Sequence, residues 1–458
     1  MSDQPAIINP DIFREYDIRG IVDKDLSPAF VELLGKATVA YLKAKRFIVG
    51  YDNRLSSPSY AEALIKGLTA AGADVIDIGQ VPTPVLYFAL RKLNIPEGVM
   101  ITGSHNPSEY NGFKIAKHTH CIYGKEIQEL LGIMQTGGLT DAAEPGTSEK
   151  MDMVTPYVEE IAGKISITDP PKIILDPGNG AAGPVVEKLF GRMGIPFKGL
   201  FMEPDGRYPN HHPDPTQPKE YGVLIETLKK EGADIGIAYD GDGDRIGVID
   251  ENGEMRWGDE IMILYAREVL AKHPGAKVCI EVKCSQGLVE DVEAHGGTAI
   301  MCPTGHSLIE AKMIETGALL TGEMSGHIYF ADDWYGFDDA IYSSVRLLAI
   351  LASTGKGVSE LLADAPKYYS SPEIRVEVPD DKKFAIVDSL KEFFSKEYEA
   401  LTIDGVRFMT GDGWGLVRAS NTQPALVVRA EGKTPEELEH IKSLLREQLE
   451  KAGVKAEF

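Results

Sequence analysis

The sequence predicts an α/β protein, in which three topologically similar α/β domains with mixed sheets precede a C-terminal α+β domain with an antiparallel sheet and two helices. Length is the first reason, because a chain of 458 residues is too long for one hydrophobic core. The second is a pattern of strand, helix and strand that recurs three times, as in the β-α-β units of parallel or mixed sheets. The third is a run of short alternating strands near the C-terminus, which is typical of an antiparallel sheet.

The three repeats place the same elements in the same order. Each begins with an apolar strand, expected at 47–51, 172–176 and 277–282. A helix that ends near glycine follows, expected at 57–71, 183–193 and 285–295. After each helix comes a second strand, expected at 74–78, 197–201 and 298–301. A further helix, at 84–93, 220–231 or 307–316, leads to a short strand and a polar loop. Three copies would therefore present three different loops at equivalent corners, and the second copy also carries an insertion at 203–218.

The C-terminal segment has a different pattern. It contains a strand at 373–378, a helix at 381–397, strand-like segments near 401, 406, 414–417 and 426–429, and an amphipathic helix at 434–451. The polar stretch 364–372 is the expected hinge before it, and 138–149 is a weaker boundary near the end of the first domain. We therefore predict four domains, at 1–150, 151–250, 251–367 and 368–458.

Composition limits the possible partners. The chain has 47 basic and 70 acidic side chains, which argues against nucleic acid as a partner, because such binding needs a basic face. The four cysteines form no C-x-x-C pair, so neither a disulfide framework nor a zinc site is indicated. No signal peptide and no long apolar run is visible, and we expect a cytoplasmic protein without a membrane partner. An acidic enzyme that binds phosphates must gather its cations locally, and five stand beside loop motifs: Arg19, Lys114, Arg245, Lys283 and Arg418.

The serine loop (residues 102–107) follows a short apolar strand at 98–101. It ends in Asn-Pro, which disfavours helix before the proline. We expect Ser104 to have an exposed hydroxyl, with His105, Asn106 and Lys114 as polar neighbours. A plain turn with local hydrogen bonds is the alternative. The loop is not the nucleophile elbow of a hydrolase, which would need glycine at Asn106.

The aspartate loop (residues 240–245) lies between two strand-like runs. Its carboxylates occur at every second residue, so in an extended loop Asp240, Asp242 and Asp244 would share one side. Three such groups would raise each other's pKa unless a cation relieves the repulsion, and Mg²⁺ favours oxygen ligands and phosphates. A solvated acidic turn is the alternative. An EF-hand is excluded because Arg245 replaces its glycine, while a dehalogenase-type phosphatase with Asp240 as nucleophile stays open.

Two more loops add polar groups. The glutamate loop (residues 322–327) offers the carboxylate of Glu323, the hydroxyl of Ser325 and the imidazole of His327, which suit adjacent sugar hydroxyls or a simple glycine turn. The arginine loop (residues 418–424) offers Arg418 with hydroxyl and amide donors, which suit a phosphate dianion or a plain turn. Phosphoryl transfer on a phosphosugar needs all four kinds of loop. No Walker or Rossmann motif competes with them.

The four loops, in this order, resemble those of the α-D-phosphohexomutases, and within that superfamily the chain most resembles the bacterial phosphomannomutase/phosphoglucomutase group. The resemblance begins at residues 15–20 (EYDIRG) and reaches the arginine loop, so it covers nearly the whole chain. It implies four domains around a central cleft, each contributing one loop. It also implies interconversion of hexose 1-phosphate and hexose 6-phosphate through a phosphoserine and a bisphosphorylated sugar.

The resemblance also assigns roles to residues. Ser104 would carry the phosphoryl group, and Mg²⁺ would be held by that group and by Asp240, Asp242 and Asp244. Candidates for catalysis beside Ser104 are Arg19, His105, Lys114 and His327. Contacts to the phosphosugar are expected from Tyr16, Arg19, Arg245, Lys283, His306, Glu323, Ser325, His327, Arg418, Ser420, Asn421 and Thr422. The hexose 1,6-bisphosphate would be intermediate and activator.

The choice of sugar is less determined. Met324 is typical of mannose and glucose mutases, whereas phosphoglucosamine mutases usually have glutamine there, so a glucosamine enzyme is an alternative by the same mechanism. A sugar-phosphate binding protein without turnover is another, although Ser104 and Lys114 argue against it. We expect a monomer or weak oligomer whose C-terminal domain closes on substrate to exclude water. Scattering profiles with and without substrate would test that closure.

Overall fold

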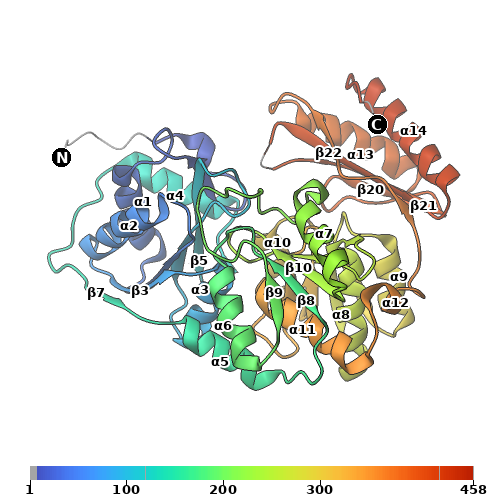
Figure 1. The fold of residues 1–458 in the computed structure, drawn as a ribbon. Helices are drawn as coiled ribbons and strands as arrows, with labels where there is room; N and C mark the ends of the chain where they lie inside the picture. Colours follow the sequence, from blue (N-terminus) through green and yellow to red (C-terminus); the bar gives the residue numbers. More distant parts are fainter. Residues whose placement is uncertain (1–7, 119, 422, 457) are drawn as a thin grey trace. The chain divides into compact units, whose positions relative to one another are not determined.

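The computed structural model describes residues 8–118, 120–421, 423–456 and 458 (Figure 1). The chain divides into two compact units, and each contains two stretches of sequence. The first unit comprises Met1–Leu264 and Ser325–Leu361, and the second comprises Tyr265–Met324 and Leu362–Phe458. The four domain boundaries expected from the sequence stay a prediction.

The first sheet of the first unit is mixed, as predicted. Its strand order is β1-β5-β4-β2-β3-β7, with β6 paired to β5. The strands are β1 (Ile18–Ile21), β2 (Arg46–Tyr51), β3 (Asp74–Gln80), β4 (Gly98–Ile101), β5 (Tyr110–Lys117), β6 (His120–Cys121) and β7 (Ser148–Lys150). Strand β2 runs parallel to β3 and β4, whereas β5 runs antiparallel to β1 and β4. The serine loop therefore connects two neighbouring antiparallel strands, β4 and β5.

Helices bury the faces of this sheet. They are α1 (Pro28–Leu42), α2 (Ser57–Ala70), α3 (Thr83–Lys92) and α4 (Lys125–Thr136). Ser27 caps α1, because its hydroxyl accepts a hydrogen bond from the backbone N–H of Phe30. The apolar side of α1 joins a core that includes Phe30, Leu64 and Phe113, all at most 1% exposed. Burial of each such side chain stabilises the fold by about 1.5–3 kcal/mol.

The second sheet of the first unit holds the aspartate loop between two neighbouring strands. Its order is β12-β11-β10-β8-β9. The strands are β8 (Ile173–Asp176), β9 (Phe197–Gly199), β10 (Ile235–Tyr239), β11 (Ile246–Ile249) and β12 (Met255–Arg256). Strands β8, β9 and β10 are parallel, and β11 turns back antiparallel to β10. The unit also contains β16 (Ile328–Phe330) and the helices α5 (Val154–Lys164), α6 (Gly183–Met193), α7 (Gly222–Glu231), α11 (Ala340–Thr354) and α12 (Val358–Leu361).

The second unit begins with a parallel arrangement of β14 (Thr298–Cys302), β13 (Lys277–Glu281) and β15 (Leu320–Gly322). Its helices are α9 (Gln286–Ala294) and α10 (His306–Thr316), while α8 (Gly258–Lys272) contains the boundary between the units. Strand β13 ends at Glu281, two residues before Lys283, and β15 ends at Gly322, directly before Glu323. The carboxyl ends of these two neighbouring parallel strands therefore lead into candidate site residues.

The C-terminal part of the second unit is the predicted antiparallel sheet with two helices. Its order is β17-β22-β21-β20-β19, with β18 also paired to β22. The strands are β17 (Tyr369–Ser370), β18 (Ile374–Glu377), β19 (Glu399–Leu401), β20 (Val406–Met409), β21 (Gly413–Ala419) and β22 (Ala425–Gly432). Helices α13 (Lys383–Glu397) and α14 (Pro435–Lys451) pack on this sheet (Figure 1).

The fold class and the predicted repeat elements are confirmed, with ends shifted by a few residues. The sequence pattern did not predict α1, α4, α5, α8, α11 or α12, because these helices lie outside the repeated unit. The stretch expected as a hinge is partly ordered, since β17 within it pairs with β22. None of the helices in the described ranges is long and apolar enough to cross a bilayer.

Candidate active site

Ser104 lies in the serine loop with both its backbone and its side chain hydrogen-bonded. It follows β4 and has a positive φ of 48°, which residues other than glycine rarely adopt. Its backbone N–H donates to Oγ1 of Thr102 at 2.8 Å, and its own Oγ donates to Oδ2 of Asp240 at 3.2 Å. The side chain was expected to be exposed, and this was wrong: Ser104 is only 3% exposed. The aspartate loop covers it, which no pattern within the serine loop could indicate.

The three aspartates converge, but not for the reason expected. The aspartate loop is a tight turn rather than an extended segment, and Gly243 has a φ of 75° that suits glycine. Oδ1 of Asp240 accepts the backbone N–H groups of Gly243, Asp244 and Arg245 at 3.0, 3.1 and 3.2 Å. This side-chain-to-backbone bonding shapes the turn. Carboxylate oxygens of Asp240, Asp242 and Asp244 consequently lie within 4.8 Å of one another.

Lys114 supplies the charge that this acidic cluster needs. From the middle of β5, its Nζ donates to Oδ2 of Asp242 at 3.0 Å and to Oδ2 of Asp244 at 2.5 Å. Burial lowers the pKa of Lys114, but the two aspartates raise it more, so it stays well above its ordinary value. Burial and the charges of Asp244 and Asp242 raise the pKa of Asp240 well above normal. Burial and the charge of Asp244 also act to raise the pKa of Asp242, but Lys114 and a hydrogen bond from Thr83 outweigh them and lower it.

The donor set fits a hard divalent cation. Oδ1 of Asp242 and Oδ1 of Asp244 are buried and have no hydrogen-bond partner in the described part of the chain. Buried carboxylate oxygens without a partner are costly, and oxygen ligands of this kind are those that Mg²⁺ and Ca²⁺ prefer. An acidic cluster able to hold a metal ion is therefore present beside Ser104.

His327 and Arg245 close one side of the cluster. Nε of Arg245 donates to Nε2 of His327 at 2.8 Å, and Nδ1 of His327 lies 2.8 Å from Oδ2 of Asp338. Burial lowers the pKa of His327, but Asp244 and Asp338 raise it by more, so the pKa lies above its ordinary value. Asp244, His327 and Asp338 form a second group of possible metal ligands that overlaps the first. Asp338 was not among the predicted site residues.

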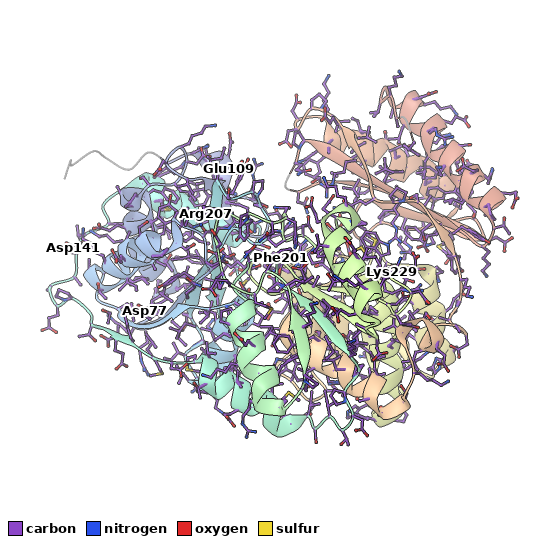
Figure 2. All side chains as sticks on the ribbon, in the orientation of Figure 1. Asp77, Glu109, Asp141, Phe201, Arg207 and Lys229 are labelled. Carbon is purple, nitrogen blue, oxygen red and sulfur yellow. The ribbon has the colours of Figure 1, made fainter. Side chains whose placement is uncertain are left out.

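The insertion at 203–218, on which Figure 2 labels Arg207, also reaches the site. Oδ2 of its Asp214 lies 3.2 Å from Nδ1 of His105, the residue after Ser104. Burial and the charge of Arg245 lower the pKa of His105 to about 4, although Asp214 acts in the opposite direction. The sequence indicated an insertion here but no role for Asp214. Its concentration of His, Asp and Pro was the available signal.

Arg19 is a predicted residue of the first unit that contacts the serine loop. Nη1 of Arg19, on β1, donates to Oδ1 of Asn106 at 3.0 Å, and its Nη2 pairs with Asp17. Tyr16 is half-buried just before β1, and Ser325 is 9% exposed. Thr83 was not predicted, yet its hydroxyl donates to Oδ2 of Asp242 at 2.6 Å. The first unit thus brings Ser104, the acidic cluster and several cations together.

The second unit gathers another set of predicted residues. Nζ of Lys283 lies 3.2 Å from Oε1 of Glu281 and 3.0 Å from Oε2 of Glu373. Burial lowers the pKa of Lys283, but Glu281, Glu373 and Glu323 raise it more, and the charge of Arg418 also acts on it. Lys283, Glu323 and Arg418 are therefore electrostatic neighbours inside one unit.

The arginine loop follows β21 in the same unit. Nε of Arg418 donates to Oδ2 of Asp404 at 2.8 Å, and the backbone N–H of Thr304 donates to the same oxygen at 2.9 Å. Ser420 is 3% exposed, Asn421 is half-buried, and Thr422 lies outside the described residues. His306 begins α10, shortly after Thr304. Lys283 and Arg418 are thus buried beside carboxylates and are not scattered surface charges.

Comparison with known proteins covers nearly the whole chain. Four domain models described as phosphoglucomutase/phosphomannomutase match: domain I at 10–138, domain II at 155–253, domain III at 257–369 and the C-terminal domain at 373–448. A phosphomannomutase/phosphoglucomutase of Pseudomonas putida is 47% identical over 449 residues, which are 97% of this chain and 96% of that protein. A phosphoglucomutase of Neisseria meningitidis is 43% identical over 451 residues, or 97% and 98% of the two chains.

A solved structure agrees with these relatives. The crystal structure of a phosphoglucomutase/phosphomannomutase family protein from Burkholderia thailandensis has a TM-score of 0.92 and 40% identity, and the match covers 98% of both chains. The matches to all four domains, the level of identity and the shared fold lead to one conclusion. The chain belongs to the phosphoglucomutase/phosphomannomutase family of enzymes.

Proposed function

We propose that this phosphohexomutase interconverts the 1-phosphate and the 6-phosphate of mannose, glucose or both, with Ser104 as the residue that carries the phosphoryl group. One observation carries the assignment of Ser104: its buried Oγ lies 3.2 Å from Asp240, within a cluster of three carboxylates and one lysine. Relatives named phosphomannomutase/phosphoglucomutase and phosphoglucomutase support the substrates.

The reaction keeps the number of phosphoryl groups constant. The bond between phosphorus and Oγ of phosphorylated Ser104 breaks as a new bond forms to the free hydroxyl of the hexose phosphate. The proton of that hydroxyl passes to a nearby base, and the product is a hexose 1,6-bisphosphate. After the sugar reorients, the bond between its other phosphorus and the sugar oxygen breaks as a bond forms to Oγ of Ser104. The base returns its proton to that sugar oxygen, which leaves the isomeric monophosphate and restores phosphorylated Ser104. Catalysis of this kind depends mainly on positioning and on neutralised charge.

Asp240, Asp242, Asp244 and the phosphoryl oxygen on Ser104 would hold Mg²⁺. When bound, the ion would neutralise charge that develops on the transferred group. Lys114 already pairs with Asp242 and Asp244, so it keeps the loop in place and adds positive charge on the same side. Proton transfer is assigned to the group of Arg19, His105, Lys114 and His327 as a whole.

The remaining residues would bind the phosphosugar. Glu323 and Ser325 would accept and donate hydrogen bonds to sugar hydroxyls, and the arginine loop, with Arg418, Ser420, Asn421 and Thr422, would hold the phosphate that is not reacting. The burial of Arg418 and Lys283 supports this role, because buried cations bind phosphate more strongly than exposed ones. Further contacts are assigned to Tyr16, Arg19, Arg245, His306 and His327.

The phosphatase alternative, with Asp240 as nucleophile, is less compatible with the geometry. Oδ1 of Asp240 accepts three backbone N–H groups, and Oδ2 accepts the hydroxyl of Ser104. Oδ1 is therefore engaged in shaping the aspartate loop, while Oδ2 faces Ser104, the residue proposed to carry the phosphoryl group. The glucosamine alternative shares the mechanism and differs only in the sugar.

Intact mass and peptide mapping, combined with coupled assays on mannose 1-phosphate, glucose 1-phosphate and glucosamine 1-phosphate, test the proposal. We expect phosphate on Ser104, isomerised sugar without released phosphate, and no activity in Ser104→Ala. Phosphate on Asp240, or release of free phosphate without isomerised sugar, would favour the phosphatase instead.

A further inference from the structure

Arg54 is a buried arginine that the predicted site does not include. It lies between β2 and α2 and is 1% exposed. Nε of Arg54 lies 3.2 Å from Oδ2 of Asp52, which neutralises the guanidinium charge. The guanidinium also lies over the ring of Tyr208, at 5.4 Å from its centre. Burying an arginine costs free energy unless its N–H groups donate hydrogen bonds. The acceptors of those hydrogen bonds therefore indicate what the side chain does.

Those partners are carbonyl oxygens of the serine loop and of the residues that follow it. Nη2 donates to the carbonyl oxygens of Ser104 at 2.8 Å and Asn106 at 2.5 Å. Nη1 donates to the carbonyl oxygens of Pro107 at 2.6 Å and Tyr110 at 2.8 Å. One planar group with fixed donor directions thus gathers the backbone from residue 104 to residue 110.

The backbone of the serine loop packs tightly against Arg54 at Gly103. A Cβ atom at Gly103 would lie 2.4 Å from Nε and Cζ of Arg54, so only glycine fits there. The backbone N–H of Gly103 also donates to Oδ2 of Asp52 at 3.2 Å. Arg54 therefore binds carbonyl oxygens of this backbone, while Asp52 accepts one of its N–H groups.

This arrangement explains how Ser104 keeps its unusual conformation. A positive φ in a residue other than glycine costs about 1–3 kcal/mol and persists only where the surroundings impose it. Carbonyl oxygens carry partial negative charge and would repel a phosphoryl dianion. With its carbonyl oxygen held by Arg54, Ser104 directs Oγ to Asp240 in the acidic cluster.

We propose that Arg54 is a positioning residue for phosphoryl transfer, which fixes the backbone of the serine loop so that Oγ of Ser104 faces the acidic cluster. This inference rests on the proposed function and deepens it. Arg54 need not touch substrate. It acts through the carbonyl oxygens of Ser104, Asn106, Pro107 and Tyr110.

The test compares Arg54→Lys with Arg346→Lys in the full-length protein. Arg346 is a matched control, because it is 4% exposed, lies in the same unit and pairs with Asp332 at 3.0 Å. A lysine at 54 cannot serve four carbonyl oxygens from two sides, and a misplacement of about 1 Å at a reacting atom can reduce the rate about 100-fold. We therefore expect kcat of Arg54→Lys to fall about 100-fold, while KM for glucose 1-phosphate changes less than about threefold. Arg346→Lys should keep kcat within about threefold of the parent value, when the two variants are compared at the same folded fraction.

A chemical rescue separates positioning from general stability. In Arg54→Ala, guanidinium at a non-denaturing concentration should restore part of kcat, whereas methylammonium should not, because only the planar ion presents donors in two directions. Restoration by both ions equally, or kcat of Arg54→Lys within twofold of the parent, would overturn the inference. An equal loss of kcat in Arg346→Lys would also overturn it.

If neither Arg54 variant folds, Gly103→Ala tests the same contact, and an unchanged kcat there would contradict the inference. The parent protein in the same assay reports the proposed function separately.

Discussion

Nζ of Lys114 lies 2.5 Å from Oδ2 of Asp244, and both groups are buried. One lysine from β5 thus reaches the turn after β10 and joins the two sheets of the first unit at the candidate active site. An internal cation that is already paired limits the repulsion within the acidic cluster, which makes the cluster compatible with folding before any metal ion binds.

Replacing Lys114 by methionine should destabilise the protein strongly when no divalent cation is present. Removing one partner of a buried ion pair typically costs about 3–5 kcal/mol, and here Asp242 and Asp244 would both lose it. Urea unfolding in EDTA measures this loss. Added Mg²⁺ should recover part of it, because a bound ion replaces the missing charge.

Lys117→Met is the matched control for this change. Lys117 lies on the same strand but is 31% exposed, and it pairs with Glu126 at the surface. Its replacement should cost at most about 1 kcal/mol. An equal loss of unfolding free energy in the two variants would show that the buried ion pair stabilises the protein no more than the surface pair.

Asp242→Asn should weaken Mg²⁺ binding roughly tenfold or more, because it removes one charged ligand. Asp338→Asn should leave the affinity close to that of the parent, since its group includes His327 and Mg²⁺ prefers oxygen ligands. Calorimetric titration of the metal-free protein with Mg²⁺ provides the measurement. The opposite order of affinities would move the metal ion to the group of Asp244, His327 and Asp338.

Glu323→Gln should affect sugar use much more than phosphorylation of Ser104. A hydrogen bond to a charged group contributes about 1.5–3 kcal/mol, so kcat/KM for glucose 1-phosphate should fall about 10- to 100-fold. Intact mass should still find phosphate on Ser104. Glu315→Gln changes a 67% exposed glutamate on α10 and should alter neither quantity. Unchanged kinetics in Glu323→Gln would remove Glu323 from the sugar site.

Glu373 should make the second unit sensitive to acid. Burial raises its pKa, but Lys283 and Arg375 outweigh burial and bring it to about 2, below the ordinary 4.5. The folded state therefore binds fewer protons than the unfolded state between these values. The resulting stabilisation is complete above pH 4.5 and is lost as the pH falls through about 2.

Urea unfolding of Glu373→Gln between pH 2 and 6 tests this prediction. The parent should exceed the variant by on the order of 3 kcal/mol above pH 5, and the two should converge near pH 2. Glu377→Gln, which changes an exposed glutamate on β18, should follow the parent at every pH. A difference between parent and Glu373→Gln that does not depend on pH would contradict the predicted shift.

The sequence alone determined the fold class, the order of the repeated elements and the four polar loops. These features are local: strand and helix periodicity, glycines and prolines at turns, and short runs such as the one around Ser104 are visible without knowledge of neighbours in space. The family also followed from the order of those loops.

Only the tertiary structure decided what surrounds each loop. Arg54, Thr83 and Asp214 reach the serine or aspartate loop from segments that are distant along the chain, and their own sequence contexts are ordinary. The burial of Ser104 and the joining of Lys114 to Asp244 have the same origin. Hydrogen bonds and ion pairs act over a few ångströms in space, so their partners depend on how sheets and helices pack, which local patterns do not specify.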